Sequence, residues 1–584
     1  MSACRFILST ARANLQAALT LLQALQHYGL QRLVLCPGSR SGPLALAAGL
    51  LASRHDLSLT TAVDERSAAF LALGLATAAG RAVAVVTTSG TAVANLLPAT
   101  VEADRSTQPL LLLSADRPLR LKNCGANQTV NQEQFLAPAC RWVWSGAVDG
   151  LHGQSQTELS HLASEAWLHA HGTAGWAPGP VHLNLAFEEP LHASAAEQQQ
   201  LLKESPQSLL RCPVELSSLL PSALEQPASP CPVLDSDQPG VVVAGPWRGL
   251  ASRHSAYQAA VQQWLKLSGW PLLADPLAAL PVDLEGRIVH WDLLLDELKL
   301  PPECQVLRLG PIPSSRRLET WLQHMDGPQL LITEGESRCL DPLKRAQQWH
   351  GGVVRWLAEQ MPKGSAPALD WHAADRWVSK QLDQLLPGSG SCSEPALARR
   401  LAKLLPPGLP VMLAASSPVR DWLSWGGLPG IDRRCFSFRG ASGIDGTLSL
   451  AVGLSLQLGA MVLVTGDLAL LHDSNGWLQA AAEGPSLLVL LIDNAGGGIF
   501  EQLPIETNEK VALEQLFVMP QQVDPLALAA AHGVPGRSVA CMDDLAHALE
   551  WGLAQNGAAI LRIRTSRDGD AQLRNGIRAQ IKVR

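Results

Sequence analysis

The feature that most constrains the fold is a repeated alternation of short apolar runs with longer helical segments. In the N-terminal third, RLVLCPG, RAVAVVTTSG and PLLLLSADRP are apolar runs that end in polar turns, whereas NLQAALTLLQALQHYG and AAFLALGLATAAG have helical patterns. Short buried strands that alternate with helices are typical of a parallel sheet covered on both faces. The sequence therefore predicts an α/β fold.

This alternation occurs three times along the chain, whose 584 residues are too many for one hydrophobic core. GVVVAG, CQVLRLGP and PQLLITEG mark a second series, and PVMLAAS, AMVLVTGD and SLLVLLIDN mark a third. Stretches rich in Gln, Ser and Pro separate the series. We predict three doubly wound parallel-sheet domains: residues 1–195, then a linker at 196–238, then residues 239–385 and 386–584.

Charge and composition exclude several classes of protein. A net charge of −7 without a Lys/Arg run argues against a nucleic-acid partner, because neutralising phosphates needs clustered cations. No apolar run approaches the roughly 20 residues of a membrane span. The 11 cysteines are scattered without a CxxC pair, which favours reduced thiols. We expect a cytoplasmic protein.

Two polar residues follow apolar runs of the third series. Asp467 comes after the run at 460–465 and Asn494 after the run at 486–492, so both should lie at the carboxyl edge of a parallel sheet. With a backbone carbonyl such as that of Gly496, they offer the oxygen ligands that Mg²⁺ or Mn²⁺ accepts. Either piece alone is more often an ordinary turn. Their spacing of 27 residues favours a metal site beside a diphosphate.

The pair Gly466 and Asp467, followed by Asn494, resembles the thiamine diphosphate motif, although Leu468 stands where a glycine is usual. That cofactor also needs a carboxylate beside its pyrimidine ring. Glu65, at the start of a predicted helix after LSLTTAV in the first series, resembles that activating glutamate. A glutamate at a helix start is otherwise commonly a partner of the helix dipole. The resemblance implies that Glu65 is catalytic.

Further motifs are similar to those of one family within the thiamine diphosphate enzymes. PGSRS, DER, ADRP, GANQ and RGASGIDG resemble the MenD family, the 2-succinyl-5-enolpyruvyl-6-hydroxy-3-cyclohexene-1-carboxylate synthases. The resemblance spans the first and third series nearly end to end and the middle series in patches. It implies decarboxylation of 2-oxoglutarate and addition of the resulting carbanion to isochorismate, in menaquinone or phylloquinone biosynthesis.

The resemblance also implies a set of site residues. Planar arginine forks suit the carboxylates of both substrates, and the predicted arginines are placed in polar loops after strands. The implied substrate contacts are Ser39, Arg40, Arg117, Asn127, Gln128, Ser416, Arg420, Arg439, Ile499 and Phe500. The implied cofactor contacts are Glu65, Gly440, Ser442, Ile444, Gly466, Asp467, Leu468, Asn494 and Gly496, of which Asp467, Asn494 and Gly496 would hold Mg²⁺ or Mn²⁺. Arg316 replaces a lysine usual in the family, so its role stays open.

Other functions stay open as alternatives. A simple thiamine-dependent 2-oxoacid decarboxylase is one, although none of the 16 histidines forms the adjacent pair that such decarboxylases use to deliver protons. A catalytically silent binding homologue is another, and the intact set of Glu65, Asp467 and Asn494 argues against it. No GxGxxG motif supports a nucleotide-dependent oxidoreductase. The resemblance further implies a homodimer or homotetramer whose sites are shared between chains.

Overall fold

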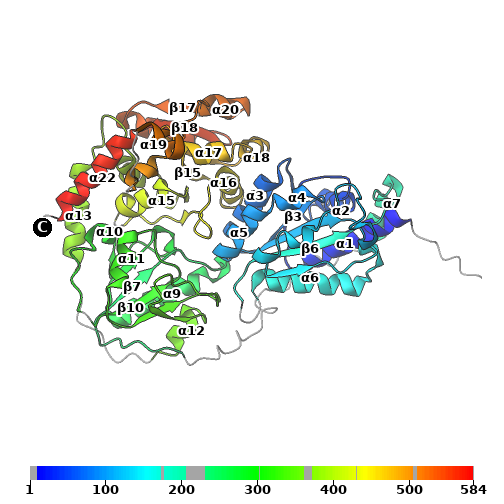
Figure 1. The fold of residues 1–584 in the computed structure, drawn as a ribbon, viewed down its shortest axis with the longest axis horizontal. Coiled ribbons are helices and arrows are strands. Elements are labelled where there is room, and N and C mark those ends of the chain that lie inside the picture. Colours follow the sequence, from blue (N-terminus) through cyan, green and yellow to red (C-terminus); the bar gives the residue numbers. More distant parts are fainter. Residues whose placement is uncertain are drawn as a thin grey trace, which may run out of the picture. The chain divides into compact units, whose positions relative to one another are not determined.

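The computed structural model describes residues 9–172, 176–204, 231–301, 303–360, 371–428, 430–503, 505 and 510–582. The chain divides into two compact units, Met1–Glu225 and Gln226–Arg584. It contains three six-stranded sheets in series along the chain, each with flanking helices (Figure 1). Every strand pair in them is parallel. The predicted α/β class with three doubly wound parallel sheets is confirmed.

The first unit contains the sheet β2-β1-β3-β4-β6-β5. Its strands are β1 (Arg32–Leu35), β2 (Ser58–Thr61), β3 (Val83–Thr87), β4 (Leu110–Asp116), β5 (Trp142–Trp144) and β6 (Pro180–Ala186). Its α-helices are α1 (Thr10–Tyr28), α2 (Gly42–Ser53), α3 (Glu65–Ala79), α4 (Thr91–Ala94), α5 (Leu97–Ser106), α6 (Gln156–His171) and α7 (Ala195–Glu204). The strands β3, β4 and β6 are buried at every residue, as expected for a sheet covered on both faces.

Local chemistry explains where the helix that carries Glu65 begins and ends. The side chain of Asp64 caps α3 by accepting a hydrogen bond from the backbone N–H of Arg66 at 2.9 Å. Gly80, with a left-handed φ of 63°, ends the helix. The predicted linker differs at its start, because residues 195–204 form α7, whose Glu204 pairs with Arg12 of α1 at 2.9 Å. Residues 205–230 of that linker lie outside the described residues.

The second sheet has the order β12-β11-β10-β7-β8-β9. Its strands are β7 (Gly240–Ala244), β8 (Leu272–Ala274), β9 (Arg287–Ile288), β10 (Gln305–Leu309), β11 (Gln329–Ile332) and β12 (Ala346–Trp349). Its α-helices are α9 (His254–Ser268), α10 (Trp291–Leu294), α11 (Arg316–Gln323), α12 (Val353–Ala358) and α13 (His372–Leu385). The three strands predicted for this series, β7, β10 and β11, lie side by side at its centre.

The third sheet has the order β14-β13-β15-β16-β18-β17. Its strands are β13 (Val411–Leu413), β14 (Cys435–Phe436), β15 (Met461–Gly466), β16 (Leu487–Asp493), β17 (Gly536–Val539) and β18 (Ala559–Arg564). Its α-helices are α14 (Glu394–Leu404), α15 (Ser417–Asp421), α16 (Thr447–Leu458), α17 (Asp467–His472), α18 (Gly476–Glu483), α19 (Lys510–Leu513), α20 (Pro525–Ala531), α21 (Leu545–Leu553) and α22 (Arg567–Lys582).

The second and third sheets share one hydrophobic core. Val241 and Trp291 of the second sheet region belong to the same buried cluster as Trp425 and Leu561 of the third. This shared core explains why residues 226–584 form a single compact unit although they contain two sheets. The domain boundaries at 239 and 386 stay a prediction.

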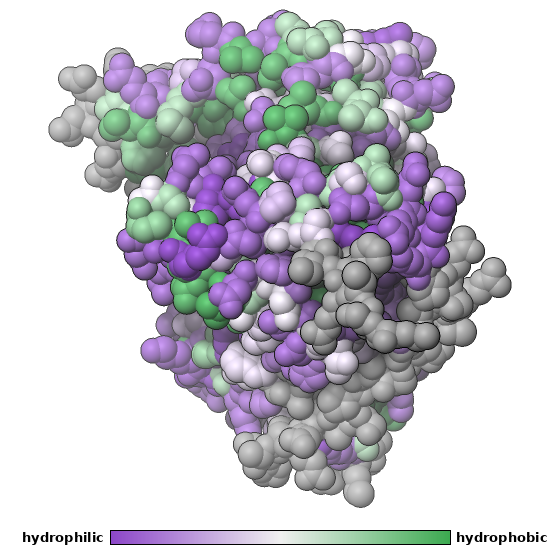
Figure 2. All heavy atoms as spheres, turned by 90° about the vertical axis from the view of Figure 1, so that its right-hand side faces the viewer, coloured by the Kyte–Doolittle hydropathy of each residue, from purple (hydrophilic) through white to green (hydrophobic). Residues whose placement is uncertain are grey.

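None of the described helices is both long and apolar enough to cross a membrane. In Figure 2, hydrophilic residues are interspersed with several separate groups of apolar residues.

Candidate active site

Asp467 lies where β15 passes directly into α17. Its Oδ1 accepts a hydrogen bond from the backbone N–H of Leu468, and its Oδ2 accepts one from the N–H of Gly496, both at 2.7 Å. Burial raises the pKa of this carboxyl to about 6, with a smaller contribution from the negative charge of Asp493. The charged carboxylate is therefore disfavoured until a positive charge lies nearby.

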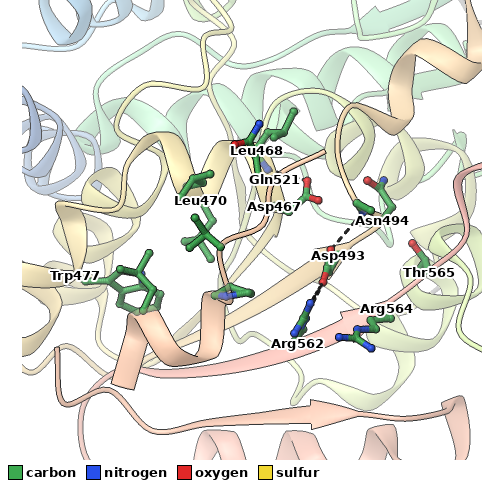
Figure 3. Close-up of a pocket in the computed structure, with 15 residues that line it drawn as sticks. Asp467, Leu468, Leu470, Trp477, Asp493, Asn494, Gln521, Arg562, Arg564 and Thr565 are labelled. Atoms are coloured by element: carbon green, nitrogen blue, oxygen red, sulfur yellow. Dashed lines mark hydrogen bonds and ion pairs between the residues drawn. The ribbon is translucent and has the colours of Figure 1, made fainter. Parts of the chain in front are cut away.

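Asn494 follows β16, the strand next to β15, so the predicted meeting of these two side chains at one sheet edge is confirmed. Figure 3 shows Asp467 and Asn494 on the wall of one pocket of about 360 Å³, with the ion pair of Asp493 and Arg562 beside them. The Nδ2 of Asn494 donates to Glu394 Oε1 at 2.6 Å. Its Oδ1 is buried and has no hydrogen-bond partner in the described part of the chain.

The glycines after Asn494 allow close backbone packing. Gly496 has a φ of +124°, and a Cβ on it would lie 2.3 Å from the carbonyl oxygen of Val518. A Cβ on Gly498 would lie 2.4 Å from Nδ2 of Asn494. A larger residue at position 496 would displace the backbone of Val518, and one at position 498 would displace the Asn494 side chain.

These features form a suitable site for a hard divalent cation and a diphosphate. A buried Asn oxygen without a partner normally needs one, and a buried carboxylate with a raised pKa is stabilised by a cation. The described residues contain no cluster of three or more His, Cys, Asp or Glu side chains for a metal. A set made of Asp467, the Asn494 amide oxygen and the Gly496 carbonyl is instead the oxygen-rich kind that Mg²⁺ or Mn²⁺ accepts.

Three arginines approach one another elsewhere in the second unit. Partial burial, and then the positive charges of Arg439 and Arg316, lower the pKa of Arg420. The Nη1 of Arg439 donates to Ser442 Oγ at 3.4 Å. Arg316, which replaces the lysine usual in the family, therefore contributes a cation to the same cluster as Arg420 and Arg439.

The segment before Arg420 is strained at Ser416. Ser416 has φ 77° and ψ −131° at the start of α15, a conformation that is costly for a residue with a side chain. Arg420 donates from Nη1 to the Ser416 carbonyl at 2.5 Å. Arg420 lies in helix α15 and not in the predicted loop, because the Pro418 ring suits the first helical turn.

Three of the predicted site residues are apolar. Ile444 is 36% exposed, and its carbonyl accepts a hydrogen bond from Thr447. Ile499 and Phe500 lie in the 3₁₀-helix Gly498–Gln502, and the Phe500 ring packs on Phe517 with centroids 5.5 Å apart. The Ile444 side chain is thus free to contact a ligand.

In the first unit, Glu65 is the first residue of α3. Among the described residues its carboxylate has no recorded hydrogen bond, while the neighbouring Asp64 serves the helix cap. Burial, and then the charges of Glu65 and Asp64, raise the pKa of Cys36 to about 12. The helix cap is satisfied without Glu65, so this carboxylate is available for another partner.

The carboxyl ends of β1, β3 and β4 bring a second set of predicted residues together. Arg40 is buried and donates to the Phe187 carbonyl at 3.0 Å and to Glu189 at 2.7 Å. Arg117 donates to Ser89 Oγ at 2.7 Å and to the Gln128 carbonyl at 2.8 Å. Partial burial, and then the positive charge of Arg40, lower the pKa of Arg117. Two guanidinium groups therefore lie near each other.

The side chains of two predicted residues of this set make no hydrogen bond to a described residue. Ser39 and Asn127 are exposed, and only their backbone carbonyls take part in recorded hydrogen bonds. Gln128 has a φ of 57° and donates from Nε2 to the Ser89 carbonyl at 2.8 Å. Ser89 was not predicted, and its position in TTSGT resembles many Ser- and Gly-containing turns.

Comparisons with known proteins agree with this geometry. The model described as thiamine pyrophosphate enzyme, N-terminal TPP binding domain, matches residues 15–135. The models for the middle domain and the C-terminal TPP binding domain match residues 236–410 and 431–563. Thiamine pyrophosphate is another name for thiamine diphosphate.

Curated relatives match nearly the whole chain. A 2-succinyl-5-enolpyruvyl-6-hydroxy-3-cyclohexene-1-carboxylate synthase of Parasynechococcus marenigrum (strain WH8102) is 64% identical over 551 residues, which is 94% of this chain and 98% of the relative. A protein of the same name from Synechococcus sp. (strain CC9902) is 62% identical over 563 residues, 96% of this chain and 98% of the relative. The chain therefore belongs to the thiamine diphosphate enzymes, in the family of the 2-succinyl-5-enolpyruvyl-6-hydroxy-3-cyclohexene-1-carboxylate synthases.

Proposed function

We propose that this protein decarboxylates 2-oxoglutarate and joins the remaining four-carbon unit to isochorismate, giving 2-succinyl-5-enolpyruvyl-6-hydroxy-3-cyclohexene-1-carboxylate and CO₂. The observation that carries the proposal is that Asp467 and Asn494, whose amide oxygen has no partner among the described residues, lie together at the carboxyl edge of the third sheet in a chain of this family. When bound, thiamine diphosphate supplies the electron sink that allows a 2-oxoacid to lose CO₂.

The chain's own residues hold the cofactor and its metal. Asp467, Asn494 and the Gly496 carbonyl would hold Mg²⁺ or Mn²⁺, and Gly466, Leu468, Gly440 and Ser442 would hold the diphosphate. The Ile444 side chain, which is exposed, would support the cofactor. Glu65 of the first unit would hydrogen-bond the pyrimidine ring and exchange a proton with it, and the absence of a hydrogen bond from its carboxylate to any described residue supports this role.

The arginine clusters bind the substrate carboxylates. Arg40 and Arg117, with Ser39, Asn127 and Gln128, form one anion site. Arg420 and Arg439, with Ser416, form another, and Ile499 and Phe500 supply an apolar wall. The lowered pKa of Arg117 and of Arg420 supports this assignment, because cations held close together are stabilised when an anion binds between them. Arg316 adds its charge to the second site.

The two halves of the site come from different chains in this proposal. Glu65 belongs to the first compact unit, and Asp467 and Asn494 belong to the second. We propose a homodimer or homotetramer with shared sites.

We place the protein in the cytosol. All cysteines of the described residues are free thiols, which supports a reducing compartment: Cys36, Cys124, Cys140, Cys231, Cys304, Cys339, Cys392, Cys435 and Cys541.

The test is identification of the product. Purified protein is incubated with thiamine diphosphate, Mg²⁺, 2-oxoglutarate and isochorismate, and the mixture is analysed by mass spectrometry. We expect the joined product, and none when either substrate is omitted. Accumulation of only the four-carbon aldehyde would support a simple decarboxylase, and an unchanged mixture would support a silent homologue.

A further inference from the structure

Glu394 is a buried carboxylate that contacts the candidate metal ligand Asn494. It is the first residue of α14 and is 3% exposed. Its Oε1 accepts a hydrogen bond from Asn494 Nδ2 at 2.6 Å, across 100 residues of sequence. No sequence motif marks this glutamate, and the metal ligand set does not include it.

This contact determines which way the Asn494 amide points. The amide presents its nitrogen, which can only donate, to Glu394 Oε1, which accepts. The amide oxygen then faces the opposite side, where Oδ1 is buried without a partner among the described residues. The orientation that satisfies Glu394 is therefore the one that leaves an oxygen free for a cation.

Arg574 of α22 holds Glu394 from its other side. The Nη2 of Arg574 donates to Glu394 Oε2 at 2.5 Å, and Arg574 also makes a two-point contact with Asp421 at 2.6 and 2.9 Å. All three side chains are at least nine-tenths buried. These short contacts from a buried guanidinium fix the rotamer of Glu394.

The same guanidinium connects the metal side and the substrate side of the proposed site. Asp421 ends α15, the helix that begins after Ser416 and contains Arg420. Arg574 thus links the start of α14, the end of α15 and, through Glu394, the turn after β16. One side chain of the C-terminal helix positions both segments.

We propose that Glu394, clamped by Arg574, is a positioning residue that orients the Asn494 amide oxygen toward the divalent metal. The inference rests on the proposed function, because it assumes that Asn494 is a metal ligand. Outer partners that orient metal ligands typically change metal affinity by about 10- to 100-fold when they are altered.

The diagnostic variant is Glu394→Gln, which keeps the size of the side chain. Arg574 needs an acceptor, so the introduced amide should turn its oxygen to Arg574 and its nitrogen to Asn494. Two amide nitrogens cannot hydrogen-bond each other, so Asn494 turns over and directs its nitrogen at the metal position. We expect Mn²⁺ affinity, measured by electron paramagnetic resonance with saturating thiamine diphosphate, to fall at least about tenfold.

A second change tests the mechanism in the opposite direction. In the Glu394→Gln background, Asn494→Asp supplies one oxygen to accept from the introduced amide and another for the metal. In the wild-type background the same change sets two carboxylates against each other. Asn494→Asp should therefore raise Mn²⁺ affinity at least about tenfold more in the Glu394→Gln background than in wild type, as a double-mutant cycle measures.

Asp341→Asn is the matched control. Asp341 forms an equally buried ion pair, with Arg308 of β10 at 2.7 Å, and takes no part in the proposed site. This change also replaces a buried acid by its amide beside an arginine. It should lower thermal stability and leave Mn²⁺ affinity within about twofold of wild type, which separates loss of folding from loss of metal orientation.

The outcomes separate this inference from the proposed function. If wild type binds Mn²⁺ with thiamine diphosphate, Asp467→Ala does not, and Glu394→Gln matches wild type, the positioning role is wrong while the proposed function stands. Additive effects in the cycle would also overturn it. If wild type binds no Mn²⁺ with thiamine diphosphate, the proposed metal site and this inference both fail.

Discussion

The arginines of the proposed anion sites differ in what their guanidinium groups already contact. Among the described residues, the Arg420 guanidinium donates a hydrogen bond to the Ser416 carbonyl alone, and burial followed by the positive charges of Arg439 and Arg316 lowers its pKa. Arg433 instead donates to the carbonyls of Pro406, Leu409 and Leu405. The contacts of Arg420 leave its guanidinium able to bind an anion, whereas those of Arg433 indicate a structural role.

Arg420→Lys should therefore raise KM for isochorismate. Lysine keeps the charge and loses the planar fork, and a charge-assisted hydrogen bond is worth about 1.5–3 kcal/mol, or roughly 10- to 100-fold. Steady-state kinetics check this, with thiamine diphosphate affinity expected to stay unchanged. Arg433→Lys is the control and should lower stability without changing KM. Equal KM effects in the two variants would contradict a substrate-binding role for Arg420.

Asp570 of α22 makes stability depend on pH. Burial, and then the negative charge of Glu394, raise its pKa to about 7. Between about pH 4 and 7 the folded protein keeps a proton that the unfolded chain has lost, so stability falls as pH rises through this range. The Tm of the wild type should therefore fall by several degrees across this pH range, because a shift of one pKa unit changes the free energy of unfolding by ~1.4 kcal/mol.

Asp570→Asn should remove this loss. The amide oxygen can still accept the hydrogen bond from the Glu394 backbone N–H, which is 3.1 Å long in the wild type. Melting curves at pH 5.5 and pH 8 should show wild type and variant close together at the lower pH and the variant more stable at the higher pH. A gap that is constant across pH would mean that Asp570 is ionised throughout.

Among individual site residues, the sequence predicts those that belong to contiguous motifs. Asp467 and Asn494 each directly follow an apolar run, so their meeting at a sheet edge follows from strand pairing alone. Glu394 and Arg574 lie 180 residues apart and meet only through the packing of α14 and α22, so no local pattern could identify them. Ser89 was not predicted as a site residue for a different reason, because its sequence TTSGT is typical of many turns.

At the level of elements, backbone strain gathers near the proposed site. Ten non-glycine residues in the described part of the chain have positive φ, and four belong to predicted site segments: Gln128, Ser416, Ser442 and Ala495. Such strain persists where the surrounding structure and function require it. Sequence patterns predicted β15 and β16 to within one residue but missed the helical start at α15, because five residues are too few for helical periodicity.

Ser416→Gly should stabilise the fold and weaken catalysis. Glycine accepts the φ of 77° without penalty, which should raise the free energy of unfolding by about 1 kcal/mol. The hydroxyl proposed to contact substrate is lost, so kcat/KM should fall. Ser416→Ala removes the same hydroxyl but keeps the strain, and it should show the lower activity without the gain in Tm. A Tm for the glycine variant at or below that of the alanine variant would contradict the strain argument.

At the scale of the whole molecule, the three predicted sheets are present but are grouped into two compact units. The sequence could predict the number of sheets, because each series has its own apolar runs. It could not predict that the second and third share a core, because Trp291 and Trp425 are typical core residues in any domain. Whether two sheets share a core depends on which of their buried faces pack against each other.

The shared-site proposal predicts complementation between two inactive variants. Glu65→Gln and Asp467→Ala damage different halves of the site, so a hybrid dimer should contain one site with both halves intact. Mixing the unfolded or dissociated chains and reassembling them should restore up to about half of the wild-type activity per hybrid. Hybrids that are demonstrated by mass and remain inactive would show that each site is built from one chain.

The most direct measurement of the central claim is CO₂ release from 2-oxoglutarate by the purified protein with thiamine diphosphate and Mg²⁺, with and without isochorismate. The account predicts that isochorismate strongly stimulates CO₂ release and that Glu65→Gln abolishes the stimulated rate. CO₂ release that is equally fast without isochorismate, or that survives in the Glu65→Gln variant, would contradict it.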